Sequence, residues 1–347
     1  MVLKIKKRIE KELRNYARSI DKIYSLNKLS FCLSKNIKEF ILRDGKRIRP
    51  ILFCIGYLGF SKKSPVGLYR SSLSLELLHD FMLVHDDIID KSSMRRGRPS
   101  MHALFKRYLA GNKKAKFSGE DLAIVAGDVM YAMALDVFLT VKENKERKEK
   151  ALKKLISATL FTGTGEFIEL LLGIKPLEKV TQKDIYKIYD YKTANYTFAS
   201  PLTMGAILAG AKPRQIKKLY AYSMLIGRAF QIKDDIAGTF GKESQTGKSN
   251  LTDIKEGKRT LLIYYAFNQA NKKDKLIIKN ILAASCIKRT DLVKIRKIII
   301  KSGALASAQY QIKHLYSQAI KQTNDLKMKK EYKLALDSFI REILLEK

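Results

Sequence analysis

Three aspartates interrupt an apolar run in the first third of the chain. The stretch LVHDDIID places Asp86, Asp87 and Asp90 close together, in a chain with 68 Lys and Arg against 34 Asp and Glu. On a helix, Asp86 and Asp90 lie one turn apart on the same face. Carboxylates gathered at a helix C-terminus repel one another and the helix dipole, so a cation is expected beside them. Magnesium accepts such oxygen ligands and completes its octahedron with phosphate and water. The alternative is a solvated acidic helix end that pairs with nearby lysines.

A second acidic cluster follows much later in the chain. In FQIKDD, Gln231 precedes Asp234 and Asp235 by three and four residues, so a helix places the three side chains on one face. A lone pair of aspartates on a helix is often structural. Two clusters that face each other across a helical bundle would instead form a polynuclear magnesium site, and we predict this arrangement.

Basic residues near the first cluster have the chemistry of phosphate ligands. GKRIRP supplies Lys46, Arg47 and Arg49 at a loop-to-helix junction, and Arg95 and Arg96 follow the first cluster. A guanidinium group can donate two hydrogen bonds to the oxygens of one phosphate, and a helix N-terminus adds backbone donors. Both segments are therefore predicted to bind a diphosphate.

Four further candidates are weaker when each is taken alone. His79 lies two turns before the first cluster, and it is either a core histidine or a donor to a second anion. Lys192, Lys248 and Lys258 would each more often be surface lysines than ligands. The last two lie in the polar segment 242–258, whose Lys, Gly and Thr residues predict a lid over phosphates.

The elements that must position these residues are helices. Apolar residues recur at intervals of three and four along most of the chain, and strand signals are nearly absent. The sequence predicts a single all-α domain over residues 1–347, a bundle of about ten or more helices around a central cavity. The expected helices are 2–18, 29–43, 47–60, 65–91, 101–111, 119–143, 146–173, 181–210, 213–239, 259–270, 273–284, 290–302, 305–322 and 329–345. Pro201 is expected to kink the helix at 181–210.

The net charge of +34 attracts anions, and nucleic acid, an anionic membrane face and diphosphates all fit that description. Most of the lysines are scattered along helices, so compositional bias explains the charge equally well. Cys32, Cys54 and Cys286 match neither a disulfide framework nor a zinc site, which favours the cytoplasm. The N-terminus lacks the apolar core of a secretory signal. The apolar stretch 122–139 contains two aspartates and favours a buried helix over a membrane span.

The order of the motifs resembles the trans-isoprenyl diphosphate synthase family along most of the chain. The motifs are GKRIRP, LLHDFMLVHDDIID, RRGRPS, YKTANYTFASP, FQIKDDIAGTFG and TGKSNLTDIKEGKRTLL. The resemblance implies an all-helical enzyme, usually homodimeric, that condenses an allylic diphosphate with isopentenyl diphosphate by using magnesium.

The resemblance also implies a role for each candidate. Three magnesium ions would be bound by Asp86, Asp87, Asp90, Asp234 and Asp235. The allylic diphosphate would be bound by Arg95, Lys192, Lys248 and Lys258, with Thr193 and Gln231 beside it at the reacting carbons. Isopentenyl diphosphate would be bound by Lys46, Arg49, His79 and Arg96. Two departures from the family pattern are Gly238, where many members have a third aspartate, and GEFIE, which leaves Glu169 as an uncertain contributor.

The length of the product is predicted from the residues before the first cluster. Within the family, the positions of Phe81 and Met82 form the floor of the hydrocarbon cavity, and an aromatic residue at 81 resembles the archaeal type of geranylgeranyl diphosphate synthase. We therefore expect a C20 product, with a C15 or a longer product as the alternative. Helix geometry places Met82 one turn below Asp86 but Phe81 on a different side, so the role of Phe81 follows from the resemblance alone.

Three other functions compete with this interpretation. A terpene cyclase also uses aspartate-rich magnesium sites, but it has no second diphosphate for GKRIRP and His79 to bind. A nucleic-acid-binding protein has no use for acidic clusters that repel phosphate. A non-catalytic partner subunit is disfavoured because both clusters are intact. The basic N-terminal helix would either contact an anionic membrane or, as we expect, dock on the rest of the bundle.

Overall fold

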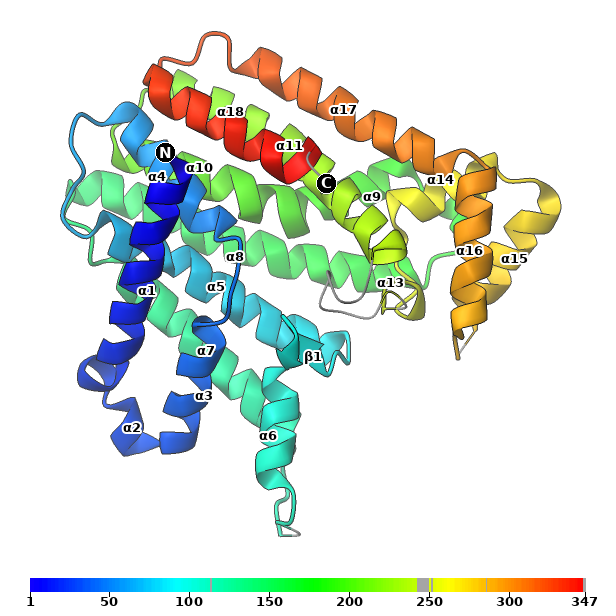
Figure 1. Cartoon of the computed structure of the whole chain (residues 1–347), viewed down its shortest axis with the longest axis horizontal. Coiled ribbons are helices and arrows are strands. Elements are labelled where there is room, and N and C mark those ends of the chain that lie inside the picture. The colour runs from blue at the N-terminus through cyan, green and yellow to red at the C-terminus, as the bar shows by residue number, and fades with distance from the viewer. Residues whose placement is uncertain (113, 242–249, 251, 285, 346–347) are drawn as a thin grey trace. The chain divides into compact units, whose positions relative to one another are not determined.

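The computed structural model describes all residues of the chain except 113, 242–249, 251, 285 and 346–347 (Figure 1). The described residues are helical almost throughout, which confirms the predicted all-α fold. They form two compact units that interleave along the sequence, and each unit is described by itself. The first comprises 1–155, 201–211 and 328–336, and the second comprises 156–200, 212–327 and 337–347. The single domain expected from the sequence stays a prediction.

The first unit is built around helix α5. Its helices are α1 (Val2–Tyr24), α2 (Leu26–Leu29), α3 (Phe31–Ile41), α4 (Ile48–Phe60), α5 (Leu68–Ile89), α6 (Met101–Leu109) and α7 (Gly119–Phe138), with parts of α8 (Lys145–Gly173), α10 (Ser200–Leu208) and α18 (Lys330–Leu345). Helix α5 packs against α7, α4 and α1. Helix α1 buries the apolar face that contains Ile9, Leu13 and Ile20 and therefore docks on its own unit.

A two-stranded hairpin follows α5, where the sequence analysis expected a break without strands. Strand β1 (Met94–Arg95) pairs antiparallel with β2 (Arg98–Pro99). The turn residues Arg96 and Gly97 both have positive φ, 53° and 71°, as a two-residue hairpin turn of type I′ requires. Arg95 and Arg96 therefore extend from a turn of defined geometry.

The second unit is built around helix α11. It contains most of α8 (Lys145–Gly173), α9 (Gln182–Ile188), η2 (Tyr189–Ala199), α11 (Pro213–Phe240), α13 (Thr252–Lys255), α14 (Leu261–Gln269), α15 (Lys272–Ala283), α16 (Arg289–Lys301), α17 (Ala304–Gln322) and the end of α18 (Lys330–Leu345), with the short 3₁₀ helix η1 (Leu177–Lys179). Helix α11 packs against η2 and α17, and α17 runs beside it in Figure 1.

The kinked helix expected at 181–210 is instead three segments. Helix α9 is followed by the π-helix η2, and α10 (Ser200–Leu208) follows η2. Pro201 has no N–H for the carbonyl four residues earlier. Upstream of Pro201, each backbone hydrogen bond of the π-helix joins residues that are five apart. The N–H of Ser200, for example, donates to the carbonyl of Asn195. Gly227 of α11 also packs closely on η2, because a Cβ at that position would lie 2.3 Å from the Cα of Ala194.

Candidate active site

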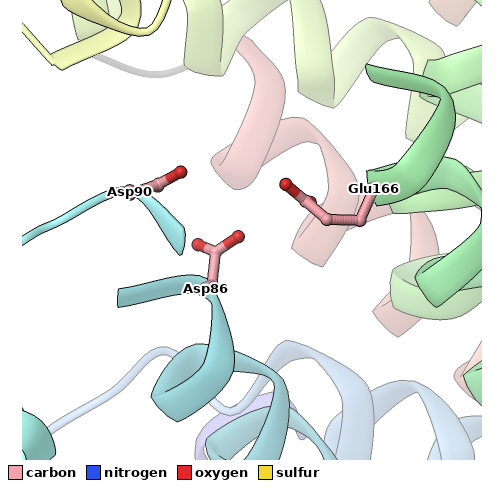
Figure 2. Close-up of side chains that lie close together, drawn as sticks. All are labelled: Asp86, Asp90 and Glu166. Atoms are coloured by element: carbon pink, nitrogen blue, oxygen red, sulfur yellow. The ribbon is translucent and has the colours of Figure 1, made fainter. Parts of the chain in front are cut away.

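The first acidic cluster lies at the C-terminal end of α5. Figure 2 shows the carboxylates of Asp86 and Asp90 extending from this end of the helix, and both residues are half-buried. Asp87 is fully buried, and one of its oxygens accepts hydrogen bonds from Nε of Arg95 at 2.8 Å and from Nη2 of the same side chain. Arg95 also lies 3.6 Å from Asp86. The three aspartates are therefore not equivalent, because Asp87 is the principal partner of the arginine.

Asp86 and Asp90 fit a magnesium ion by the chemistry of their donors. Both offer carboxylate oxygens one helical turn apart, and hard divalent cations prefer such oxygens. Burial acts to lower the pKa of Arg95, but the charges of Asp87, Asp86 and Asp90 outweigh it and raise the pKa above its ordinary value. The guanidinium group therefore stays charged beside the cluster.

Several arginines lie near His79, two turns before the aspartates on α5. Burial, and then the charges of Arg49 and Arg96, lower the pKa of His79 well below its ordinary value. The imidazole is therefore neutral at pH 7, and it donates an N–H without adding a charge. Arg49 lies in the first turn of α4, and Lys46 is exposed just before that helix. The structure thus brings His79, Arg49 and Arg96 together in the first unit.

Two buried carboxyl groups of α5, which the sequence analysis did not single out, accompany these arginines. Glu76 and Asp80 are 2% and 0% exposed. Arg47 is 2% exposed, pairs with Glu76 and lies 2.8 Å from Glu10, so its guanidinium group links α4 to two carboxylates. Arg96 lies 3.6 Å from Glu76 and 3.5 Å from Asp80. The spacing of four between two acidic residues in an apolar helix was the available sequence signal.

Lys192 of the π-helix lies between two glutamates of α8. Its Nζ is 2.5 Å from Glu169 and also pairs with Glu166. The backbones of α8 and η2 approach closely here, because a Cβ on Gly165 would lie 2.7 Å from the backbone nitrogen of Lys192. Glu166, which Figure 2 also labels, was missed by the sequence analysis although it lies in the GEFIE motif. The structure places both glutamates of that motif against Lys192.

The second acidic cluster is linked to the π-helix by a chain of hydrogen bonds. The hydroxyl of Thr193 donates to Gln231, whose amide nitrogen donates to Asp235 at 2.9 Å. The other oxygen of Asp235 accepts from the hydroxyl of Tyr189. Asp235 is 5% exposed, whereas Asp234 is exposed. Predicted residues Thr193, Gln231 and Asp235 are therefore neighbours in the second unit.

Asp253 is a further carboxylate that the sequence analysis did not single out. A Cβ on Gly238 would lie 2.3 Å from an oxygen of Asp253, so this side chain occupies the space beside the glycine. Lys258 lies 2.6 Å from Glu256 and 3.6 Å from Asp253. The predicted ligand Lys248 lies outside the described residues.

The two residues predicted to control product length precede Asp86 on α5, Met82 by four residues and Phe81 by five. Phe81 and Met82 are both half-buried. The ring of Phe81 packs on Tyr131 of α7 with 5.2 Å between ring centroids, and on His85 with 4.7 Å. Its position is therefore fixed by two aromatic neighbours.

Comparisons with known proteins show the family of the chain. The profile of the family described as polyprenyl synthetase matches residues 31–299. The chain is 30% identical to the geranylgeranyl diphosphate synthase of Saccharolobus solfataricus over 74% of this chain and 73% of the relative. It is also 30% identical to the geranylfarnesyl diphosphate synthase of Aeropyrum pernix, over 81% of this chain and 83% of the relative.

Solved structures of similar fold include a geranylgeranyl pyrophosphate synthase from Corynebacterium glutamicum, which was crystallised with isoprenyl diphosphate and magnesium. It has a TM-score of 0.89, covers 99% of both chains and is 25% identical in sequence. A geranylgeranyl pyrophosphate synthetase from Pyrococcus horikoshii has a TM-score of 0.79 over 98% of this chain and 99% of its own. The chain belongs to the polyprenyl synthetase family and is a trans-prenyltransferase.

Proposed function

We propose that this prenyltransferase makes geranylgeranyl diphosphate, a C20 product, from isopentenyl diphosphate and shorter allylic diphosphates. The observation that carries the proposal is that α5 has an acidic end and, two turns earlier, a histidine among arginines. Asp86 and Asp90 at its end suit a metal-bound diphosphate, and the arginines around His79 suit a second diphosphate without metal. A terpene cyclase needs the acidic end only.

Each diphosphate would have its own set of basic residues. We assign isopentenyl diphosphate to Lys46, Arg49, His79 and Arg96, and the allylic diphosphate to Arg95, Lys192, Lys248 and Lys258. Magnesium, when bound by the two acidic clusters, would neutralise charge on the allylic diphosphate, and we propose three ions. The pairs that fix Arg95 and Lys192 hold their charges in place before the substrate arrives, which favours the transition state.

The reaction begins with heterolysis of the allylic C–O bond. Pyrophosphate leaves with the electron pair, and the fixed charges of Arg95 and Lys192 stabilise it more than they stabilise the intact substrate. The alkene of isopentenyl diphosphate then forms the new C–C bond with the allylic cation. The proton lost from the resulting cation is accepted by the departing pyrophosphate, so no side-chain base is needed. Thr193 and Gln231 would lie beside the reacting carbons, where water must be excluded.

The C20 length is proposed from Phe81 and its neighbours. The packing of Phe81 on Tyr131 and His85 leaves the ring little freedom to move aside for a longer chain. The similarity to a geranylgeranyl diphosphate synthase supports the same length. The similarity to a geranylfarnesyl diphosphate synthase makes a C25 product the alternative outcome.

The exposed face of α8 supports pairing of two chains. Its apolar residues repeat at helical spacing along the part in the second unit, and the members are Ile156, Leu160, Phe167, Leu170 and Leu171. Each is between 45% and 66% exposed. Among the described helices, α8 alone is long and apolar enough to cross a bilayer. Glu166 and Glu169 would be costly in hydrocarbon, so we propose that this face forms the interface of a homodimer.

We also propose that the enzyme acts in the cytoplasm. Cys54 is fully buried, and burial raises the pKa of its thiol to about 12, which keeps it unreactive. The three cysteines are all free, as expected in a reducing compartment. Peripheral contact with an anionic membrane would use the exposed lysines of α1, because its apolar face is buried.

The decisive experiment combines labelled isopentenyl diphosphate with dimethylallyl, geranyl or farnesyl diphosphate, with and without magnesium. We expect magnesium-dependent transfer that ends at C20 with every primer. Cyclic hydrocarbon from geranylgeranyl diphosphate alone would instead identify a terpene cyclase. Magnesium-independent binding of DNA that tightens steeply at low salt, without prenyl transfer, would identify a nucleic-acid-binding protein.

A further inference from the structure

The buried hydroxyl of Tyr189 connects three elements of the second unit. Tyr189 is the first residue of η2 and is 4% exposed. Its hydroxyl donates a hydrogen bond to Asp235 on α11. The same oxygen accepts from the backbone N–H of Leu261, the first residue of α14, at 2.8 Å. One side chain therefore joins the π-helix, the second acidic cluster and the segment that follows Lys258.

Both carboxylate oxygens of Asp235 are held by uncharged donors. One accepts from Tyr189 and the other from the amide of Gln231 at 2.9 Å. Asp87 of the first unit differs, because its partner Arg95 carries a full positive charge. Neutral donors orient a carboxylate without cancelling its charge, and each carboxylate oxygen keeps a further lone pair. Asp235 is thus fixed in direction, and each of its oxygens can accept a further partner.

We propose that Tyr189 is a positioning residue for metal binding at the second acidic cluster. Its hydroxyl fixes the orientation of Asp235, as the partners of metal-binding carboxylates do in other sites. The proposal rests on the proposed function, in which Asp234 and Asp235 bind magnesium.

The experiment compares two buried tyrosines of the same unit. Tyr189→Phe removes the hydroxyl that contacts Asp235. Tyr222→Phe is the matched control, because Tyr222 is 1% exposed on α11 and its hydroxyl has no hydrogen-bond partner among the described residues. For each protein, thermal unfolding is followed with inorganic pyrophosphate present while magnesium is titrated. The readout is the magnesium concentration that gives half of the stabilisation, measured beside prenyl transfer and the KM for isopentenyl diphosphate.

We expect Tyr189→Phe to raise this magnesium concentration about tenfold to a hundredfold, the range found when a partner of a metal ligand is removed. Its KM for isopentenyl diphosphate should stay within about twofold of the wild type, because that diphosphate is assigned to the first unit. Tyr222→Phe should match the wild type in both measurements. An unchanged magnesium midpoint in Tyr189→Phe would overturn the positioning role. Absence of prenyl transfer by the wild-type protein would instead overturn the proposed function.

A double variant keeps the proposal testable if Tyr189→Phe does not fold. Replacing both partners of a buried hydrogen bond costs less than replacing one. Tyr189→Phe combined with Asp235→Asn should therefore fold, and a folded double variant would support action through Asp235. If the single variant folds, the double variant should bind magnesium no more weakly than Asp235→Asn alone. If the double variant also fails to fold, Tyr189 serves core packing and the proposal is overturned. The same holds if the loss of magnesium affinity in the double variant equals the sum of the losses in the two single variants.

Discussion

Arg95 donates two hydrogen bonds to a single carboxylate oxygen of Asp87, which is fully buried. The second residue of the first acidic cluster is therefore part of a buried ion pair. Asp86, on the same turn, is half-buried. The pair holds Arg95 beside the cluster. Asp87 should therefore contribute mainly to stability, and Asp86 mainly to catalysis.

Asp87→Asn should destabilise the fold, whereas Asp86→Asn should mainly abolish activity. Removing one partner of a buried ion pair leaves an uncompensated charge, and we expect a loss of about 3 kcal/mol for Asp87→Asn. Asp86→Asn should change the free energy of unfolding by less than about 1 kcal/mol. Urea unfolding and magnesium-dependent prenyl transfer, measured on both variants, test this separation. Equal destabilisation by the two substitutions would contradict it.

Phe81→Ala should lengthen the product. Removal of the ring opens the space in front of Tyr131 and His85, so chains beyond C20 are expected. Phe81→Tyr is the matched control and should leave the product distribution unchanged. Chromatographic analysis of dephosphorylated products gives the chain lengths. The same distribution from the alanine variant as from the wild type would remove Phe81 from this role.

Lys192→Met should lower the rate of transfer about a hundredfold to a thousandfold. The substitution removes a fixed charge that is assigned to the leaving group, and the loss of one such donor has this magnitude in other enzymes. It also leaves Glu166 and Glu169 close together without their shared cation. Lys187→Met, at an exposed lysine of α9, is the control and should retain full activity. Single-turnover rates with saturating magnesium would distinguish the two, and equal rates would refute the assignment.

Asp80 should make stability depend on pH. Burial raises the pKa of its carboxyl from 3.8 to about 8, although the charge of Arg96 acts in the opposite direction. The folded state therefore binds more protons than the unfolded state between those values, and stability is lost as the pH rises through this window. Asp80→Asn cannot ionise and should weaken this dependence. Urea midpoints of both proteins at about pH 5 and about pH 8 measure the effect, and parallel curves would argue against it.

Phe167→Glu should dissociate the proposed dimer. Phe167 is 64% exposed in the middle of the apolar face of α8, and a carboxylate there would be buried between two chains. Leu276→Glu is the control, because Leu276 is 57% exposed on α15, outside that face. Sedimentation velocity should show monomers for the first variant and dimers for the second. Dimers in both would place the interface elsewhere.

The sequence by itself determined the helical fold and the positions of the acidic clusters. Apolar periodicity is a local property of the backbone, so it predicted α5 and placed Asp86 and Asp90 on one face before any packing was known. The order of motifs identified the family for the same reason, since it requires residue types and spacing alone. Local spacing did not predict the hairpin at Arg95 or the π-helix that replaced a kinked α-helix.

Tertiary structure decided which groups are partners. Tyr189 and Asp235 are 46 residues apart, and they meet only because η2 packs on α11. Arg47 lies within a predicted phosphate motif, yet it is buried and pairs with Glu76 of α5. Which groups become partners depends on how deeply each charge is buried and on which side chains pack beside it, because an unpaired charge away from water is costly. Neither quantity is a property of the neighbouring residues in the sequence.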